Sequence, residues 1–373
     1  MSLSPKNSDL KPLFEPIAFG DIKAKNRVLM APLTRNRSHA DGTPAKMAIE
    51  YYRQRAGAGL IITEATQISA QGKGYKDTPG IYTPKHIAAW KEITDAVHAE
   101  GGKIVCQLWH VGRISHTSLQ EGGKAPVSAS DIAAETMTFT ENGFEPTSKP
   151  RALTPTDIRG VVRDYVHAAK CAMEAGFDGV EVHGANGYLI DQFLQESSNP
   201  RTDSYGGNPE KRVRFLMEVV TAVVDAIGAG RTGLRLSPTG KFNDVSSTDT
   251  EKVFTTAIDR LNPLGLAYLH VVERFPGMPI NPSEEALLTR LQAHWNGPFI
   301  SNGGYGADDG ASTIGKGRAD AIAYGRPYIA NPDLAERFAA GASLNTPDQD
   351  TFYGGGAHGY TDYPFMNEKK NVA

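Results

Sequence analysis

The sequence from Thr154 to His183 reads TPTDIRGVVRDYVHAAKCAMEAGFDGVEVH, and this stretch decides the fold class. Its first part predicts a helix over Thr154–Ala175, because the segment opens with the N-terminal capping signal Thr154-Pro155-Thr156-Asp157 and ends at Gly176. The run Asp178–His183 that follows carries Val180 and Val182 and is one of a set of short runs rich in Val, Ile and Leu, several of them nearly continuously apolar, which is typical of parallel strands buried on both faces. The stretch therefore predicts a helix that returns the chain to a parallel strand.

The same alternation extends over most of the chain. Short runs rich in Val, Ile and Leu are the predicted strands: Arg27–Thr34, Gly59–Thr66, Lys103–His110, Asp178–His183, Thr232–Pro238, Leu266–Glu273, Pro298–Gly303 and Ala319–Arg326. Segments with helical spacing follow them: Ala45–Ala56, Pro84–Glu100, Thr154–Ala175, Pro209–Ile227, Thr248–Leu261, Ser283–His294, Ala307–Lys316 and Asn331–Ala340. This α/β pattern predicts a (β/α)8 TIM barrel. A doubly wound sheet is the alternative, but no G-x-G-x-x-G follows the first strand.

We expect one barrel domain over residues 1–373, with frayed ends at Met1–Lys11 and Lys369–Ala373. Residues 111–153, after the third strand, form an excursion without a strong helix, in which Gly, Pro, Ser and Thr recur. An excursion of this length is usually a functional cap, and in a barrel it would lie on the catalytic face. A hairpin without a functional role is an equally weighted alternative.

Composition excludes several classes of protein. The chain has 373 residues, of which 40% are hydrophobic and 22% charged, and 39 basic against 42 acidic residues give a net charge of −3. Without a basic block, nucleic acid is not expected as a partner. The two cysteines cannot build a disulfide framework, a zinc site or an iron–sulfur cluster, and they fit the cytoplasm. We expect no signal peptide, no membrane span and no metal site.

The active site of a barrel forms where the strands end. The glycines of Gly303-Gly304 allow backbone N–H groups to approach an anion closely, and the helix expected from Ala307 would direct its positive end there. Gly325-Arg326, at the end of the next strand, adds a guanidinium suited to phosphate oxygens. The pair predicts a phosphate site, with a tight turn as the alternative for Gly303-Gly304 alone.

Other strand ends suit a flat ring that forms hydrogen bonds. The Gln107 amide offers a donor and an acceptor, as a uracil-like edge requires, and Arg235 would place positive charge beside a ring that gains electrons. These residues predict flavin mononucleotide (FMN) across the barrel mouth; a salt bridge with Glu64 is the alternative for Arg235. His183 and Asn186 can both donate to one carbonyl or nitro oxygen, with the Tyr188 phenol nearby, although a lone histidine is more often a core residue.

At these residues the sequence resembles the Old Yellow Enzyme family of FMN-dependent ene-reductases, from about Leu13 to Phe365. The resemblance rests on strand motifs and is most specific from His183 to Leu194, with a tail typical of the bacterial branch that includes N-ethylmaleimide reductase, pentaerythritol tetranitrate reductase and morphinone reductase. The motifs are Asn26-Arg27-Val28, Ala31-Pro32-Leu33-Thr34-Arg35, Glu64-Ala65-Thr66, Gln107-Leu108-Trp109-His110-Val111-Gly112-Arg113, His183 to Leu194, and the tail from Phe352 to Pro364.

The resemblance implies a role for each matching residue. The flavin ring would contact Pro32, Thr34, Ala65, Gln107 and Arg235. The phosphate would be held by Gly303, Gly304, Gly325 and Arg326. His183 and Asn186 would bind the substrate oxygen, His183 also lying against the cofactor, and Tyr188 would be the proton donor. Tyr75, Trp109 and Tyr353 would shape the cavity over the flavin.

The implied activity is reduction of the activated C=C bond of α,β-unsaturated carbonyl and nitro compounds, and in some relatives of nitroesters or nitroaromatics. NADPH or NADH would supply the hydride, FMN would be bound noncovalently, and the enzyme would be a monomer or homodimer. Two alternatives remain open from the residues. A barrel hydrolase would need two carboxylates at strand ends, for which only Glu64 and Glu273 qualify. A non-catalytic flavin-binding barrel would not need Tyr188 beside two donors.

Overall fold

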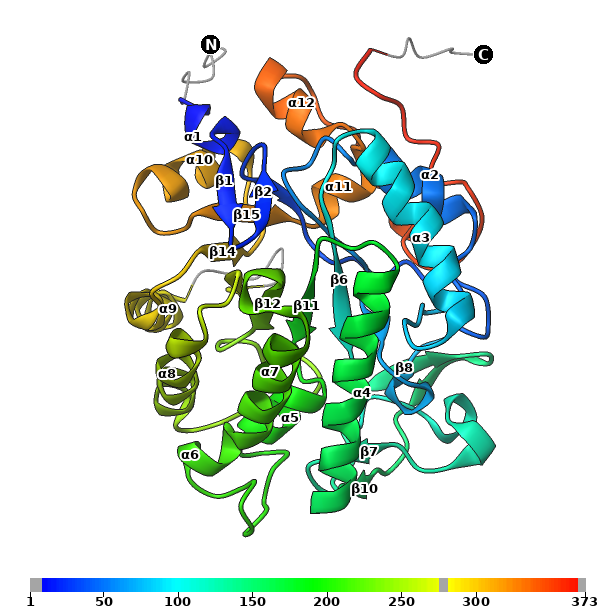
Figure 1. Ribbon diagram of the computed structural model, residues 1–373, viewed down its shortest axis with the longest axis vertical. Helices are drawn as coiled ribbons and strands as arrows, with labels where there is room; N and C mark the ends of the chain where they lie inside the picture. The colour runs from blue at the N-terminus through cyan, green and yellow to red at the C-terminus, as the bar shows by residue number, and fades with distance from the viewer. Residues whose placement is uncertain (1–8, 275–280, 368–373) are drawn as a thin grey trace.

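The computed structural model describes residues 9–274 and 281–367, and within them the predicted parallel barrel is confirmed (Figure 1). Its strands are β3 (Val28–Met30), β4 (Ile61–Ile62), β6 (Ile104–Trp109), β11 (Gly179–His183), β12 (Thr232–Leu236), β13 (Tyr268–Val272), β14 (Phe299–Asn302) and β15 (Ala321–Tyr324). Each is parallel to the next, and pairing of β15 with β3 closes the barrel. The predicted strand Gly59–Thr66 is interrupted: β4 and β5 (Thr66–Gln67) pair separately with β6.

Helices surround the barrel, as Figure 1 shows for α3, α4, α7, α8 and α9. Their bounds are α2 (Met47–Arg53), α3 (Pro84–Ala99), α4 (Pro155–Glu174), α5 (Leu189–Leu194), α6 (Pro209–Arg212), α7 (Arg214–Ile227), α8 (Thr250–Leu261), α9 (Pro282–His294), α10 (Ala307–Gly315), α11 (Arg326–Ala330) and α12 (Leu334–Ala340). The helix predicted over Pro209–Ile227 is divided into α6 and α7, and α5 and α11 were not predicted. Among the described residues, no helix has the length and apolar content needed to cross a membrane.

The ends of α4 agree with the sequence signals that predicted them. The Thr154 side chain accepts a hydrogen bond from the Asp157 N–H at 3.2 Å, and the Asp157 carboxylate accepts one from the Thr154 N–H at 2.9 Å. This reciprocal capping box satisfies two N–H groups that the helix itself leaves unpaired. After the helix, Gly176 takes a φ of +86°, in the left-handed region that favours glycine.

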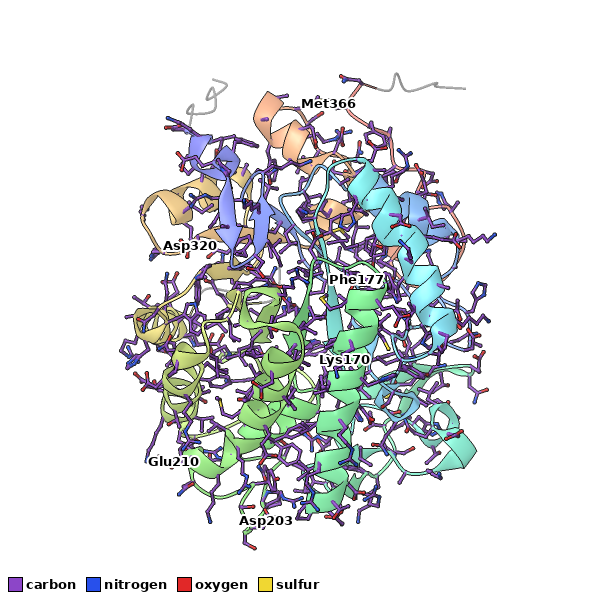
Figure 2. All side chains as sticks on the ribbon, in the orientation of Figure 1. Lys170, Phe177, Asp203, Glu210, Asp320 and Met366 are labelled. Atoms are coloured by element: carbon purple, nitrogen blue, oxygen red, sulfur yellow. The ribbon has the colours of Figure 1, made fainter. Side chains whose placement is uncertain are left out.

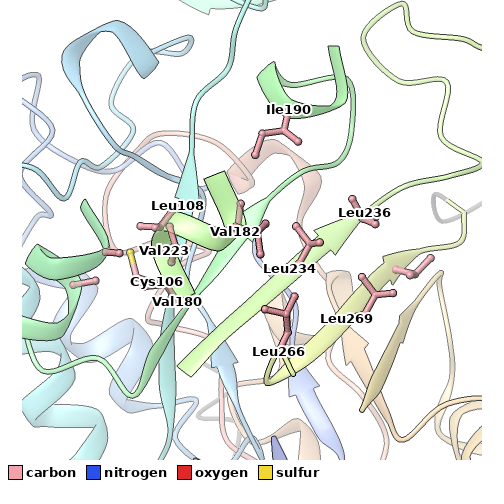
Figure 3. Close-up of a cluster of buried hydrophobic side chains, with 14 of the residues drawn as sticks. Cys106, Leu108, Val180, Val182, Ile190, Val223, Leu234, Leu236, Leu266 and Leu269 are labelled. Atoms are coloured by element: carbon pink, nitrogen blue, oxygen red, sulfur yellow. The ribbon is translucent and has the colours of Figure 1, made fainter. Parts of the chain in front are cut away.

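Alternating side chains along the strands separate two hydrophobic clusters. One set points outward and packs between the barrel and its helices, where Figure 3 shows Val180, Val182, Leu234 and Leu236 around Leu108, Ile190 and Val223. The other set fills the half of the barrel interior that is farther from the carboxyl ends of the strands; it comprises Leu29, Leu60, Ile62, Val105, Tyr268 and Ile300. An N-terminal hairpin that the sequence did not predict, β1 (Ile17–Phe19) and β2 (Ile22–Ala24), packs Phe19 and Ile22 against that interior.

Side chains fill the space between the strands and the surrounding helices (Figure 2), but polar residues replace apolar ones toward the strand ends. On β6 the inward positions run Val105, Gln107, Trp109, and on β11 Glu181 and His183 follow Gly179. All five side-chain-bearing residues are buried. The sequence of β6 and β11 therefore places a polar layer above the apolar base of the barrel, at the end where the site is expected.

The excursion over residues 111–153 contains two short 3₁₀ turns and four short strands, β7 (Val127–Ser128), β8 (Met137–Thr140), β9 (Gly143–Pro146) and β10 (Arg151–Ala152). β8 and β9 form an antiparallel hairpin, and β7 and β10 are parallel. Ile114 and Ala134 of this excursion pack in one cluster with Trp109 and Tyr188. The excursion therefore packs against one side of the site at the carboxyl ends of the barrel strands.

The expected frayed ends lie mostly outside the described residues, which exclude 1–8 and 368–373. Within the described part, Leu10 packs against the hydrophobic core and Lys11 begins a short helix, α1 (Lys11–Phe14). The described ends of the chain, at α1 and Met366, lie at one end of the molecule, whereas β7 and β10 of the excursion lie at the other (Figures 1 and 2).

Candidate active site

Three predicted site aromatics lie together at the ends of their elements. Trp109 ends β6, Tyr188 immediately precedes α5, and Tyr75 follows the second barrel strand. The Tyr75 and Trp109 rings are stacked with centroids 5.6 Å apart, and Tyr188 meets Trp109 edge-on at 4.9 Å. His183, at the end of β11, meets the same Tyr188 ring at 5.2 Å. The fold thus brings together residues that are more than a hundred positions apart in the chain.

His183 is held as a neutral imidazole with a defined tautomer. It is 2% exposed, and burial, followed by the nearby charges of Arg235 and His270, lowers the pKa of its ring well below the usual value. The Ala185 N–H points at its Nδ1 at 3.4 Å, so Nδ1 is the acceptor. A neutral imidazole has one N–H. The proton therefore lies on Nε2, which makes His183 a neutral hydrogen-bond donor.

Asn186 has a strained backbone that is fixed from two sides. Its φ is +60°, a left-handed conformation in which asparagine is among the tolerated residues. Its N–H donates to the Ser237 hydroxyl at 2.7 Å, and its carbonyl accepts from the Asn243 side chain at 2.9 Å. Its own side-chain oxygen has no hydrogen-bond partner in the described part of the chain. These contacts orient the turn after His183 and leave the Asn186 amide available to a ligand.

The Tyr188 hydroxyl lies within hydrogen-bond distance of a second phenol. Its oxygen lies 3.2 Å from that of Tyr75. Burial raises the pKa of Tyr188, and hydrogen bonds from Tyr75 and Asn243 oppose that rise, as donors to its oxygen would. The pKa of Tyr75 is raised well above its usual value, first by burial and then by Tyr188. Tyr188 is therefore a protonated phenol at neutral pH, in contact with Tyr75 and Asn243.

Asn243 is a site residue that sequence reasoning missed. It lies after β12 with a φ of +62°, is 5% exposed, and touches both Asn186 and Tyr188. The available signal was the polar pair Asn243-Asp244 after the fifth strand, since residues that follow barrel strands contribute to the site.

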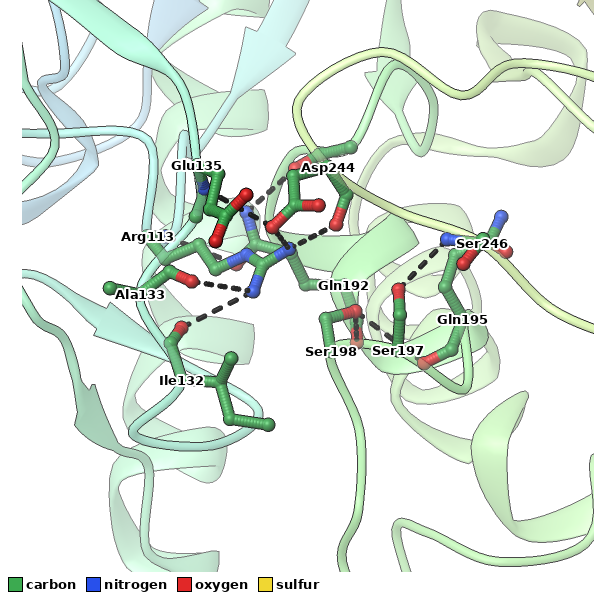
Figure 4. A network of polar contacts seen from close by, with 12 residues as sticks. Arg113, Ile132, Ala133, Glu135, Gln192, Gln195, Ser197, Ser198, Asp244 and Ser246 are labelled. Atoms are coloured by element: carbon green, nitrogen blue, oxygen red, sulfur yellow. Dashed lines mark hydrogen bonds and ion pairs between the residues drawn. The ribbon is translucent and has the colours of Figure 1, made fainter.

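The buried Arg113 ties the loop that carries Asn243 to the excursion (Figure 4). Its guanidinium donates to the Ile132 carbonyl at 3.2 Å and the Asp244 carbonyl at 2.5 Å. The guanidinium also lies 3.7 Å from the Asp244 carboxylate. The backbone N–H of Arg113 donates to the side-chain oxygen of Gln192 at 3.1 Å. One buried cation thus links three segments around the site.

Arg235 lies inside the barrel, but the alternative of a salt bridge with Glu64 is wrong. Its Nη2 donates to the Asn302 side-chain oxygen at 2.9 Å, and its Nε has no partner among the described residues. Glu64 is instead bound by the Arg35 N–H at 3.3 Å and the Tyr52 hydroxyl at 3.4 Å. A buried guanidinium with an unpartnered N–H fits a ligand acceptor at this position.

Both glycine positions of the predicted phosphate site disfavour a side chain. Gly304 has a φ of +78°, and a Cβ at Gly303 would lie 3.3 Å from side-chain atoms of Glu273 and Arg274. The nine-residue helix α10 begins shortly after them. Arg326 starts α11 with an exposed side chain, next to Gly325. Backbone N–H groups, a helix N-terminus and the exposed guanidinium of Arg326 together suit an anion.

The remaining ring residues border the same mouth. Pro32 and Thr34 follow β3 and are partly exposed, while Ala65 is 5% exposed and packs with Trp109 and Tyr188. Gln107 turns its amide nitrogen to the Glu181 carboxylate at 2.7 Å. The donors at Gln107 and Arg235 and the glycine turn at Gly303-Gly304 fit the flavin mononucleotide that the sequence predicts at these residues.

Tyr353 lies on a C-terminal segment that two arginines hold in place. The buried Arg35 donates to the carbonyls of Phe352 at 2.9 Å and Gly359 at 2.8 Å, and Arg37 donates to that of Thr351 at 2.9 Å. The Tyr353 side chain is 62% exposed, yet it contributes to raising the pKa of both Tyr75 and Tyr188. The tail therefore brings an aromatic side chain to the rim of the site.

Comparisons with known proteins agree with this architecture. Residues 12–345 match the NADH:flavin oxidoreductase / NADH oxidase family (Oxidored_FMN). The chain is 45% identical to 12-oxophytodienoate reductase 1 of Oryza sativa subsp. japonica, over 96% of this chain and 94% of that protein. It is 44% identical to 12-oxophytodienoate reductase 2 of Arabidopsis thaliana, over 95% and 96% respectively.

Solved structures are equally similar. Morphinone reductase, a member of the branch that the tail resembles, superimposes with a TM-score of 0.92 and 46% identity over 97% of this chain and 98% of its own. The Old Yellow Enzyme homologue from Zymomonas mobilis gives 0.90 and 42% over 94% and 99%. These matches exclude the doubly wound sheet and the barrel hydrolase, and they make this protein an FMN-dependent NAD(P)H oxidoreductase. The chain belongs to the NADH:flavin oxidoreductase / NADH oxidase family.

Proposed function

We propose that this oxidoreductase reduces the activated C=C bond of α,β-unsaturated carbonyl and nitro compounds. The observation that carries the proposal is the convergence of a neutral His183 donor and a protonated Tyr188 phenol, whose rings lie 5.2 Å apart. The His183 N–H can donate to a substrate oxygen that gains negative charge, and the Tyr188 phenol can give a proton to a substrate carbon. The names of the relatives, 12-oxophytodienoate reductase and morphinone reductase, support reduction of small unsaturated substrates.

The chemistry that bound FMN would supply is hydride transfer, with NADPH or NADH as the electron donor and the β carbon of the alkene as the acceptor. The protein's own residues do the rest. His183 Nε2–H and the Asn186 amide hold the substrate oxygen and stabilise the negative charge that develops on it. Tyr188 gives its proton to the α carbon.

Tyr75 and Asn243 support the proton transfer from Tyr188. Both contact the Tyr188 oxygen, and both lower the pKa of a phenol whose burial raises it. Donors to that oxygen stabilise the phenolate left after the proton has gone. We infer that they also aim the Tyr188 O–H into the cavity, where Trp109 and Tyr353 line the walls.

The same proposal assigns the remaining residues to noncovalent FMN. Pro32, Thr34, Ala65, Gln107 and Arg235 would contact the ring, and Gly303, Gly304, Gly325 and Arg326 would hold the phosphate. The unpartnered Arg235 Nε and the turn at Gly303-Gly304, where Gly304 takes a φ of +78°, support this placement. Since both cysteines are free and buried, we infer a reducing, cytoplasmic setting. We also infer a monomer or a homodimer, which light scattering on the purified protein would distinguish.

Stopped-flow spectroscopy tests the activity in two steps. The bound flavin should bleach with NADPH or NADH and regain its absorbance on addition of cyclohexenone or a nitroalkene. Comparison of the two nicotinamides identifies the preferred donor. If NADPH or NADH bleaches the flavin but none of a panel of enones and nitroalkenes reoxidises it, the proposal is wrong and the enzyme reduces another class of substrate.

Titration with a para-substituted phenol tests the donor pair without turnover. A phenolate stacked on oxidised flavin should give a long-wavelength charge-transfer band, whose oxygen His183 and Asn186 would hold. We expect the double variant His183→Ala/Asn186→Ala to lose the band and most of the affinity. His294→Ala, at an exposed histidine on α9, is the matched control and should bind like wild type. Equal dissociation constants for the double variant and the control would reject the site.

A further inference from the structure

A charged cluster that the proposed reaction does not use lies inside the barrel, beneath the expected ring. Glu181 on β11 is 0% exposed. One carboxylate oxygen accepts from the Gln107 side chain at 2.7 Å, and the other accepts from His270 Nδ1 at 2.9 Å. Glu181 and Gln107 are direct register partners on adjacent strands, so backbone pairing enforces their contact.

Glu181 is ionised despite its burial. Burial favours the neutral acid, but the charges of His270 and Arg235 and the hydrogen bonds from His270 and Gln107 outweigh it and lower the pKa of the carboxyl. An ionised carboxylate only accepts hydrogen bonds. Gln107 must therefore turn its NH2 group toward Glu181, and its carbonyl oxygen must point elsewhere. The chemistry of the pair thus determines the orientation of an amide that is otherwise free to flip.

We propose that Glu181 is a positioning residue that locks Gln107 with its carbonyl oxygen toward FMN. The inference rests on the proposed placement of the ring over Gln107. The pyrimidine edge of a flavin presents two carbonyl acceptors and one donor, the N3–H. Because Glu181 holds the NH2 group on its own side, the amide oxygen is directed to the other side, and as an acceptor it can pair only with the N3–H of the ring. Glu181 thereby specifies which atom of the ring Gln107 binds and keeps the amide ordered before the cofactor arrives.

A double-mutant cycle on FMN binding tests this inference. Apoprotein would be titrated with FMN, and quenching of flavin fluorescence would give the dissociation constant of wild type, Glu181→Gln, Gln107→Leu and the double variant. We expect Glu181→Gln to weaken binding about tenfold, because a neutral amide partner no longer dictates the Gln107 orientation. In the Gln107→Leu background the same change should have no further effect. Glu174→Gln, an exposed site on α4, is the matched control.

The bound cofactor reports the contact directly. With 15N-labelled FMN, the N3–H proton should be strongly deshielded in wild type and shift upfield in Glu181→Gln, while Glu174→Gln leaves it unchanged. A loss of affinity that is equal in the wild-type and Gln107→Leu backgrounds, or an N3–H signal indifferent to Glu181, would overturn the positioning role.

A measurement on the wild-type protein alone covers the case in which Glu181→Gln does not fold. With 15N-glutamine labelling, the side-chain signals that disappear in Gln107→Leu should show one amide proton strongly protected from solvent exchange. An unprotected pair would contradict the lock. Failure of wild-type apoprotein to bind FMN would instead refute the proposed function, and it leaves the exchange measurement as an independent test of the Gln107–Glu181 contact.

Discussion

Replacing Tyr188 with phenylalanine removes the proposed proton donor and almost nothing else. The aromatic ring that meets Trp109 at 4.9 Å and His183 at 5.2 Å is retained. Only the hydroxyl is lost, together with its 3.2 Å contact to Tyr75 and its hydrogen bond with Asn243. The cavity shape and the donor pair that binds the substrate oxygen should therefore stay as they are.

The expected loss is confined to one half of the catalytic cycle. General acid catalysis typically contributes about 10²–10⁴-fold, which corresponds to roughly 3–5 kcal/mol of the barrier. Reoxidation by cyclohexenone should slow by that factor, whereas flavin reduction by NAD(P)H needs no acid and should change by no more than a few-fold. Because the pKa of Tyr188 is raised, wild-type reoxidation should not lose its acid at neutral pH.

Stopped-flow measurement of both half-reactions, with each phase at saturating substrate, provides the assay. Tyr75→Phe is the matched control, since it removes the neighbouring hydroxyl and keeps the Tyr188 O–H, and it should cost much less than Tyr188→Phe. Nitroalkenes should be less affected by Tyr188→Phe, because a nitronate can leave the site and take its proton from water. If Tyr188→Phe is reoxidised by cyclohexenone at the wild-type rate, the proton comes from another source and Tyr188 only packs.

Three further changes have expected outcomes. Arg326→Ala should weaken FMN retention by about 1.5–3 kcal/mol through loss of a charge-assisted contact, measured by fluorescence titration; unchanged affinity would place the phosphate elsewhere. Arg113→Met should lower the free energy of unfolding in urea by about 1.5–3 kcal/mol, because the charge-assisted hydrogen bonds to the Ile132 and Asp244 carbonyls are lost. Lys149→Met, in an exposed ion pair of the same excursion, is the control and should cost under about 1 kcal/mol. Burial raises the pKa of Glu64 from 4.5 to about 7. The free energy of unfolding of wild type relative to Glu64→Gln should therefore fall by about 3 kcal/mol as the pH rises from 4.5 to about 7, and then level off. A difference in unfolding free energy that does not change with pH would contradict a buried neutral acid.

The sequence alone determined the barrel and the strand ends at which the site lies. Alternation of apolar and polar positions, and capping signals such as Thr154 with Asp157, depend on residues that are close in the chain. Strand ends are where barrel sites form, so Gln107, His183 and Arg235 could be recognised as candidates from their place in the pattern. These residues predicted FMN, and the family resemblance extended the prediction to an ene-reductase and to the role of each site residue.

Only the tertiary structure decided how those side chains are paired. Tyr75 and Tyr188 are 113 positions apart and Arg113 and Asp244 are 131 apart, and no local pattern relates such residues. The same holds for Arg235, which binds Asn302 instead of Glu64, and for Asn243, whose role depends on two neighbours from another loop. Secondary structure follows from short-range periodicity, but the partner of a buried polar group is whichever residue the closed barrel brings within hydrogen-bond distance, because desolvation makes an unpaired polar group costly.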